Sequence, residues 1–278
     1  GREAIATGAA AKAAAPSATT APTPARTAAP APRPAAPTVT GEATQLEERI
    51  PLRGVRKRIA EQMVTSKYTA PHVTVMDEVD VTELVRVREG ALPLAAERGI
   101  KLTYLPFMIK AVIAGLREFP YLNASLDDAN QTIVLKRYYH IGIATDTEEG
   151  LIVPVVKNAD QKSILQLAAE IADLVERARN RRIALEDLRD GTFTLTNVGP
   201  LGGLFSTPII NHPEVAILGI HRIRERPVVH NGAIVARQIL PLALSFDHRV
   251  VDGAYAARFL NRVMRYLEQP SLLFMELI

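Results

Sequence analysis

Apolar residues recur along most of this chain with two periods, one typical of helices and the other typical of strands. Spacings of three and four residues predict amphipathic helices, whereas strict alternation predicts half-buried strands. Helices are expected at 54–70, from Thr82 onward, from Pro106 to Pro120, at 163–183 and at 254–270. Strands are expected at 72–81, 131–147, 151–160, 191–199, 214–223 and 226–249.

The order of these segments predicts the fold class. Helices and strands alternate irregularly, and "HNG" at 230–232 is typical of a tight hairpin turn. A regular doubly wound sheet would alternate strand and helix throughout. We therefore expect an α/β (α+β) protein with a two-layer architecture, in which helices pack against a mixed sheet.

The first part of the chain has a different composition from the rest. Residues 1–47 are rich in alanine, proline and threonine and contain few large apolar side chains. Such a segment cannot bury enough apolar surface to offset its ordering entropy, so we expect a disordered linker. Residues 48–278 are then the folded domain. Because linkers join domains and this chain opens with glycine, we also expect a further domain upstream.

Composition narrows the function classes. The net charge is only +3 although the pI is about 9.2, and most basic residues are interleaved with acidic ones, so we expect no nucleic-acid partner. No apolar run is long enough for a membrane span and no signal peptide pattern occurs. Cysteine is absent, which suits a cytoplasmic protein, and any thiol chemistry must then use thiols that substrates carry.

One histidine stands out from the other five. In "SFDHRVVDGAYAARF", residues 245–259, an apolar strand ends in a charged segment that contains His248, and Asp252-Gly253 follows as a predicted turn before a helix. A neutral histidine at a strand end can act as a general base near neutral pH. A structural histidine hydrogen-bonded to Asp252 fits the same spacing equally well.

The segment "GTFTLTNVGPLGG", residues 191–203, is the second candidate. Thr192, Thr194 and Thr196 alternate along a strand and share one face. We interpret the first two as strand-forming residues, whereas Thr196 at the strand end could donate a hydrogen bond to an oxyanion. The glycines do not form a dinucleotide-binding motif, and no nucleophile elbow surrounds Ser245. The histidine spacing also predicts no metal site.

Several segments, in this order, resemble the catalytic domain of the dihydrolipoamide acyltransferases, the E2 components of 2-oxo acid dehydrogenase complexes. They are "PLRGVRKRIAEQM", "APHVTVMDEVDVTEL", "FPYLNASLDD", "HIGIATDTEEGLIVPVVKNAD", "GTFTLTNVGPLGG", "STPIINHPEVAILGIHRIRERPVV" and "LSFDHRVVDG". The resemblance covers roughly residues 48–278, and the sequence of residues 206–220 is most similar to family members from bacterial pyruvate dehydrogenase complexes. It implies a chloramphenicol acetyltransferase-like fold.

The resemblance also implies roles for individual residues. His248 would take the proton from the thiol of coenzyme A, a substrate, and Thr196 would stabilise the oxyanion, a position at which many relatives have serine. Asp252 would hold the loop through an ion pair, for which Arg86 and Arg88 are candidate partners. Gly253 would allow the turn. The lipoyl group would be carried on a domain absent from this chain, since no lysine follows an aspartate.

The implied assembly is a homotrimer with the active site between subunits, built into a large cubic or icosahedral core. The E1 decarboxylase and the E3 dihydrolipoamide dehydrogenase would bind through missing N-terminal domains. Branched-chain acyl or succinyl transfer, a stand-alone chloramphenicol-type enzyme and a non-catalytic scaffold remain as alternatives. The apolar tail "PSLLFMELI" is predicted to contact another trimer, with packing into the core as the alternative.

Overall fold

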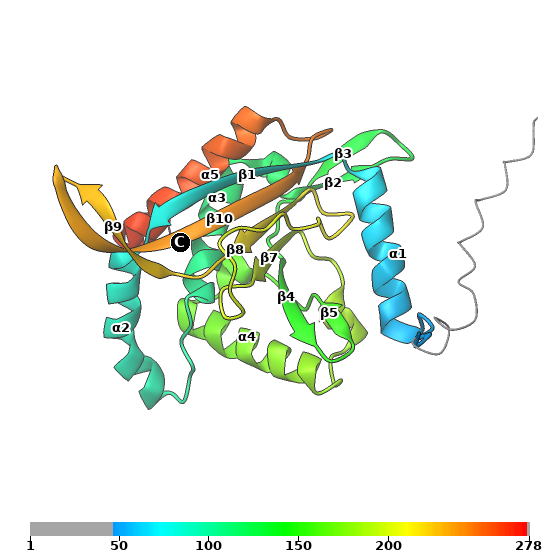
Figure 1. Cartoon of the computed structure of the whole chain (residues 1–278), viewed down its shortest axis with the longest axis horizontal. Coiled ribbons are helices and arrows are strands. Elements are labelled where there is room, and N and C mark those ends of the chain that lie inside the picture. The colour runs from blue at the N-terminus through cyan, green and yellow to red at the C-terminus, as the bar shows by residue number, and fades with distance from the viewer. Residues whose placement is uncertain (1–46, 277–278) are drawn as a thin grey trace, which may run out of the picture. The chain divides into compact units, whose positions relative to one another are not determined.

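Figure 1 shows a computed structural model of the chain, which describes residues 47–276. The helices are α1 (Gly54–Thr69), α2 (Thr82–Glu97), α3 (Leu105–Glu118), α4 (Ile164–Arg179), α5 (Gly253–Glu268) and α6 (Leu273–Glu276). Short 3-10 helices are η2 (Pro120–Leu122), η3 (Ala159–Gln161), η4 (Leu185–Leu188) and η5 (Pro270–Leu272). The predicted linker lies, except for Glu47, outside the described residues.

The strands form one large sheet and one small hairpin. They are β1 (His72–Asp80), β2 (Ala124–Asp127), β3 (Thr132–Leu135), β4 (Ile141–Thr147), β5 (Gly150–Ile152), β6 (Val155–Val156), β7 (Phe193–Asn197), β8 (Ala216–Ile220), β9 (Arg224–His230) and β10 (Ala233–Asp247). The large sheet has the order β1-β10-β8-β7-β4-β5, with β6 beside β4 and β9 beside β10. Among the described strands, only the β4–β7 and β7–β8 pairs are parallel, so the expected mixed sheet is confirmed.

Helices cover one face of this sheet. Figure 1 shows α3 and α5 behind β1 and β10. Helix α3 is buried from Leu105 through Leu116, including Lys110, as its mostly apolar sequence predicts. Helix α4 begins with a capping box, in which the Ser163 side chain accepts from the Gln166 backbone and the Gln166 side chain accepts from the Ser163 backbone. The two-layer α/β architecture is therefore confirmed.

The 15-residue strand β10 is the central element for function, because it carries the candidate histidine at its end. It pairs with β1, β8 and β9. Leu242, Leu244 and Phe246 lie in the main hydrophobic core, whereas Ser245 shares a 2.7 Å hydrogen bond with Thr74 of β1. A strand fixed on both sides and both faces is a rigid support for the residue that follows it.

The described part of the C-terminal tail packs partly into the core, and Leu272 is partly buried against it. Leu273 has only 3% of its surface exposed and belongs to the main core, whereas Met275 is 81% exposed. Residues 277 and 278 lie outside the described part of the chain. Leu272 and Leu273 pack within their own subunit, whereas the predicted contact of the tail with another trimer stays a prediction.

Candidate active site

His248 is the first residue after β10, and the backbone around it is well anchored. Its backbone N–H donates to the carbonyl of Pro71 at 3.0 Å, and the backbone N–H groups of Val250 and Val251 both donate to the carbonyl of Asp247 at 3.1 Å. The His248 side chain is exposed, and within residues 47–276 its ring has no hydrogen-bond partner. The fold thus presents a free imidazole on a fixed backbone.

Asp252 and Gly253 play a different local role from the one that the sequence predicts. The Asp252 side chain accepts from the backbone N–H of Tyr255 at 2.7 Å and so caps the N-terminus of α5. Gly253 is the first residue of α5, its φ is not positive, and no atom would contact an added Cβ. The expectation of an Asp252-Gly253 turn is therefore wrong, because the turn lies at residues 248–250.

The expected ion pair of Asp252 with Arg86 or Arg88 is not formed within the described chain. Arg86 pairs with Glu83 at 2.6 Å, and Arg88 donates to the carbonyl of Leu102 and stacks on a neighbouring tyrosine. Both arginines lie on α2, which follows the far end of β1. Since β1 and β10 are antiparallel over nine pairs, α2 and Asp252 lie at opposite ends, about 27 Å apart along the strand direction. Within one subunit, therefore, neither Arg86 nor Arg88 is the partner of Asp252.

Thr196 is half-buried near the end of β7, in the middle of the sheet. The register places it opposite Gly219 of β8, which lies opposite Ala243 of β10. His248 is five positions beyond Ala243, so the two candidate residues are separated by about 16 Å along the strands and about 10 Å across them. One subunit therefore does not bring Thr196 and His248 together.

The two preceding threonines have structural partners. The Thr192 hydroxyl donates to the carbonyl of His140 at 3.2 Å. The Thr194 hydroxyl donates to a carboxylate oxygen of Glu214 at 2.6 Å. Both threonines are fully buried. These bonds anchor β7 and so help to fix Thr196 at its end.

Glu214 is a buried carboxyl group that the sequence analysis did not single out. Its Oε2 accepts from Thr194 and its Oε1 accepts from the Asn211 side chain at 3.0 Å. A Cβ on Gly191 would lie 2.5 Å from Oε1, so only glycine leaves room for the carboxyl group. Desolvation by burial raises the pKa of Glu214 to about 7, against the opposing hydrogen bonds and the charge of Lys136.

We expect Glu214→Gln to remove a pH dependence of stability. Because the folded-state pKa lies above the unfolded value of 4.5, the protonated form favours folding, and this stability is lost as pH rises toward and through 7. The amide is neutral at every pH, and its two ends can pair with Thr194 and Asn211. The variant should be more stable than wild type at pH 8, by on the order of 3 kcal/mol.

Urea unfolding from pH 5 to pH 8 measures this effect. Glu97→Gln is the matched control, since Glu97 is exposed. Equal pH slopes for wild type and Glu214→Gln would contradict the buried titration.

A hydrogen bond between His221 and Ser206 is a further feature that the sequence did not predict. The buried His221 ring contacts the Pro241 carbonyl through Nδ1 at 3.2 Å, and Ser206 Oγ through Nε2 at 2.9 Å. Since a carbonyl only accepts, Nδ1 carries the proton and the Ser206 hydroxyl donates to Nε2. Burial lowers the pKa of His221, against the opposing hydrogen bond to the Pro241 carbonyl. The pair ties the segment after β7 to the sheet.

Two other histidines also bond to the backbone. His72 receives the backbone N–H of Ile210 at 3.0 Å, and His140 receives that of Asn158 at 3.0 Å. Residues 47–276 contain no group of three side chains that could hold a metal ion.

Comparison with known proteins identifies the family. Residues 44–275 match the model of the acyltransferase catalytic domain of 2-oxoacid dehydrogenases. The chain belongs to this family. It is 52% identical over 242 residues to the dihydrolipoyllysine-residue acetyltransferase component of the pyruvate dehydrogenase complex of Bacillus subtilis, and 49% identical over 243 residues to that of Staphylococcus aureus. These matches cover 87% of this chain but 54% and 56% of the relatives, so the chain spans about half their length.

Solved structures share the fold of this acyltransferase domain. Azotobacter vinelandii dihydrolipoamide acetyltransferase matches with a TM-score of 0.82 and 40% identity, over 86% of this chain and 99% of that one. The truncated catalytic core of the 2-oxoacid dehydrogenase multienzyme complex of Thermoplasma acidophilum matches with a TM-score of 0.74 and 46% identity, over 81% and 99%. The family resemblance predicted from the sequence is therefore confirmed.

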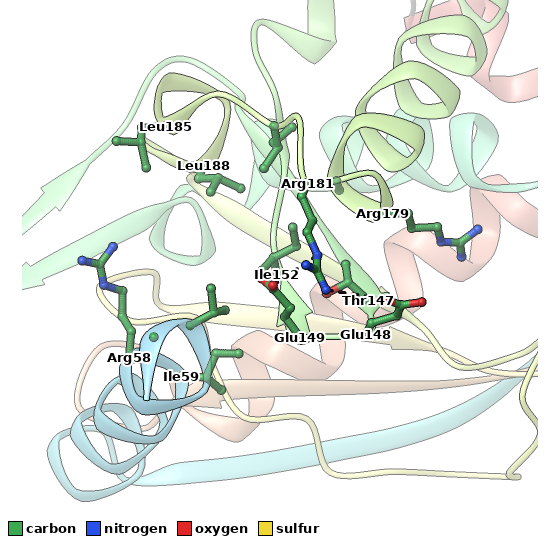
Figure 2. Close-up of a pocket in the computed structure, with 14 residues that line it drawn as sticks. Arg58, Ile59, Thr147, Glu148, Glu149, Ile152, Arg179, Arg181, Leu185 and Leu188 are labelled. Atoms are coloured by element: carbon green, nitrogen blue, oxygen red, sulfur yellow. Dashed lines mark ion pairs between the residues drawn. The ribbon is translucent and has the colours of Figure 1, made fainter. Parts of the chain in front are cut away.

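This acyltransferase domain also has a cavity of about 540 Å³ away from the candidate catalytic residues. Figure 2 shows it between Ile59 of α1, Ile152 of β5 and Leu188 of η4. Arg181 pairs there with Glu148 and Glu149, at 3.5 and 3.1 Å. Neither His248 nor Thr196 lines this cavity, so it is not the candidate catalytic centre.

None of the helices in the described part is long and apolar enough to cross a bilayer.

Proposed function

We propose that this chain transfers an acetyl group from S-acetyldihydrolipoamide to coenzyme A, with His248, Thr196 and Asp252 in the active site. One observation carries the assignment. The Azotobacter vinelandii enzyme has been studied for the catalytic roles of a serine, a histidine and an asparagine, with 52 positions between the first two and four between the last two. Thr196 and His248 are also 52 positions apart, and His248 and Asp252 are four apart.

The chemistry follows from the side chains. The neutral imidazole of His248 accepts the proton of the coenzyme A thiol, and the thiolate attacks the thioester carbonyl of the acyl donor. The Thr196 hydroxyl donates a hydrogen bond to the oxyanion of the tetrahedral intermediate, which then expels the dihydrolipoamide thiolate. Asp252 acts on His248 indirectly, because its side chain caps α5 and so fixes the C-terminal end of the loop that carries His248. Both thiols belong to substrates, which agrees with the absence of cysteine.

We further propose that each site is shared between two subunits of a homotrimer. The separation of His248 from Thr196 within one subunit supports this arrangement, since both groups must reach the same thioester carbonyl. A similar chain forms the cubic core of a pyruvate dehydrogenase multienzyme complex, at 40% identity and a TM-score of 0.82. A large core built from trimers is accordingly the proposed assembly of this chain.

Mixing two inactive variants tests the shared site. His248→Ala and Thr196→Val subunits are unfolded together and reassembled, and each should have little activity alone. If sites form between copies, about a quarter of them will contain both an intact histidine and an intact threonine, because the two contributions are drawn independently. Activity near a quarter of wild type is therefore expected. A mixture as inactive as its components would show that both residues act within one subunit.

The remaining partners follow from the same proposal. The lipoyl group would come from a domain outside this chain. The E1 decarboxylase and the E3 dihydrolipoamide dehydrogenase would bind to domains outside this chain as well, and the complex would be cytoplasmic.

The acetyl group is favoured because the relatives from Bacillus subtilis and Staphylococcus aureus are acetyltransferase components. Rates with acetyl-CoA, isobutyryl-CoA and succinyl-CoA as donors to dihydrolipoamide measure this preference, and a higher kcat/KM for either of the latter two would contradict it.

A further inference from the structure

The residue on each side of His248 belongs to one ionic clamp. Asp247 is a carboxylate with only 3% of its surface exposed. Its Oδ1 accepts from the backbone N–H and the Nε of Arg249, both at 3.0 Å, and its Oδ2 accepts from Nε at 3.1 Å and Nη2 at 2.7 Å. A buried carboxylate is costly unless it is paired in this way. The guanidinium therefore fixes the side chain of Asp247 firmly.

The same guanidinium reaches a second anchor outside the loop. Arg249 Nη1 donates to Oδ1 of Asp128 at 2.6 Å, in the turn between β2 and β3. This turn is itself ordered, since Asp127 accepts from the backbone and the side chain of Asn130 at 3.1 and 2.8 Å. Arg249 thus connects the end of β10 to a separate hairpin, 121 positions away in the chain.

These contacts hold the backbone of the residue between them. The Asp247 and Arg249 side chains are joined across His248, and the His248 N–H bonds to Pro71. The direction of the imidazole is then set by a backbone with little freedom to rotate. Loss of the clamp would leave His248 present but less accurately directed. A misplacement of about 1 Å can lower a reaction rate by about 100-fold.

We propose that Arg249 is a positioning residue for His248, with Asp128 as its outer anchor. This inference rests on the proposed function, since it assigns Arg249 a role in acyl transfer that it exerts through the base. Arginine suits the role because its planar fork contacts Asp247 with Nε and Nη2 while Nη1 remains free for Asp128. Lysine carries the same charge but cannot make this set of contacts.

The experiment compares Arg249→Lys and Asp128→Asn with wild type in acetyl transfer from acetyl-CoA to dihydrolipoamide. We expect Arg249→Lys to lower kcat about 10- to 100-fold and Asp128→Asn about 3- to 10-fold, with both KM values nearly unchanged. Melting temperature and particle size check folding, and Asp128→Asn leaves the buried Asp247 pair intact. Arg177→Lys is the matched control, because Arg177 of α4 also bridges two carboxylates, Asp173 of α4 and Asp187 of η4.

A second comparison separates positioning from general stability. If Arg249 acts through His248, Arg249→Lys will not lower the residual rate of His248→Ala any further. The inference is overturned if Arg249→Lys lowers the rate equally in both backgrounds. It is also overturned if Arg249→Lys and Asp128→Asn keep the wild-type kcat while His248→Ala is inactive. If His248→Ala keeps the wild-type kcat, the proposed function itself fails and the positioning role falls with it.

Discussion

Replacing His248 with alanine is expected to lower kcat for acetyl transfer by about 100- to 10,000-fold, the range usual for loss of a general base. Without the imidazole, the coenzyme A thiol must lose its proton to solvent, and little thiolate is present at neutral pH. Folding should be little affected, because the His248 side chain is exposed and, within the described residues, its ring forms no hydrogen bond and makes only a tilted contact with Phe246. The backbone bond to Pro71 is kept in the variant.

The measurement is thioester exchange between acetyl-CoA and dihydrolipoamide at saturating substrate, with particle size determined on the same samples. His230→Ala is the matched control, since His230 is also exposed and, within residues 47–276, its ring hydrogen-bonds only to Arg237 in the hairpin of β9 and β10. An unchanged kcat in His248→Ala would remove His248 from the mechanism. Loss of the assembled particle would instead show that the histidine is needed for structure.

Replacing Thr196 with valine is expected to lower kcat by about 100- to 1,000-fold with little change in KM. Valine keeps the shape and the β-branched character of threonine, so β7 should retain its pairing with β4 and β8. Only the hydroxyl is lost. Because the oxyanion exists in the tetrahedral intermediate and not in the bound substrate, the loss should affect the chemical step and leave binding nearly intact.

Thr196→Ser is the matched control for this prediction. Serine retains the donor hydroxyl, so its kcat should stay within a few-fold of wild type, while valine and serine should bind acetyl-CoA equally well. Saturation kinetics for both substrates separate the two parameters. A rise in KM at constant kcat in Thr196→Val would assign Thr196 to substrate binding and would contradict its role at the oxyanion.

Local patterns were sufficient to predict most of the elements. The helices expected at 54–70, 163–183 and 254–270 appear as α1, α4 and α5, with bounds within four residues. Helical and strand periodicities depend on which face of a segment is buried, and that information is present in neighbouring residues. The family was also evident from the order of its motifs, and the comparisons confirm it.

The environment of His248 was predicted less accurately. Asp247 and Arg249 were visible as flanking charges, but their connection to Asp128 crosses 121 positions and has no local signature. Arg86 and Arg88 are the candidate partners of Asp252 that the resemblance implies, but within one subunit the antiparallel pairing of β1 and β10 puts them at the other end of the sheet. Sequence distance says nothing about which strand ends meet.

The sequence by itself determined the helices and strands, the mixed-sheet fold class, the family, and His248, Thr196 and Asp252 as the residues to examine. Only the tertiary structure decided that Asp252 caps α5 and that the buried Glu214 is hydrogen-bonded to Thr194. It also decided that Thr196 and His248 lie too far apart to act within one subunit. The physical reason is that periodicity and capping arise from interactions between near neighbours in the chain. Burial of a charge and the distance between strand ends depend on strand register, which long-range pairing sets.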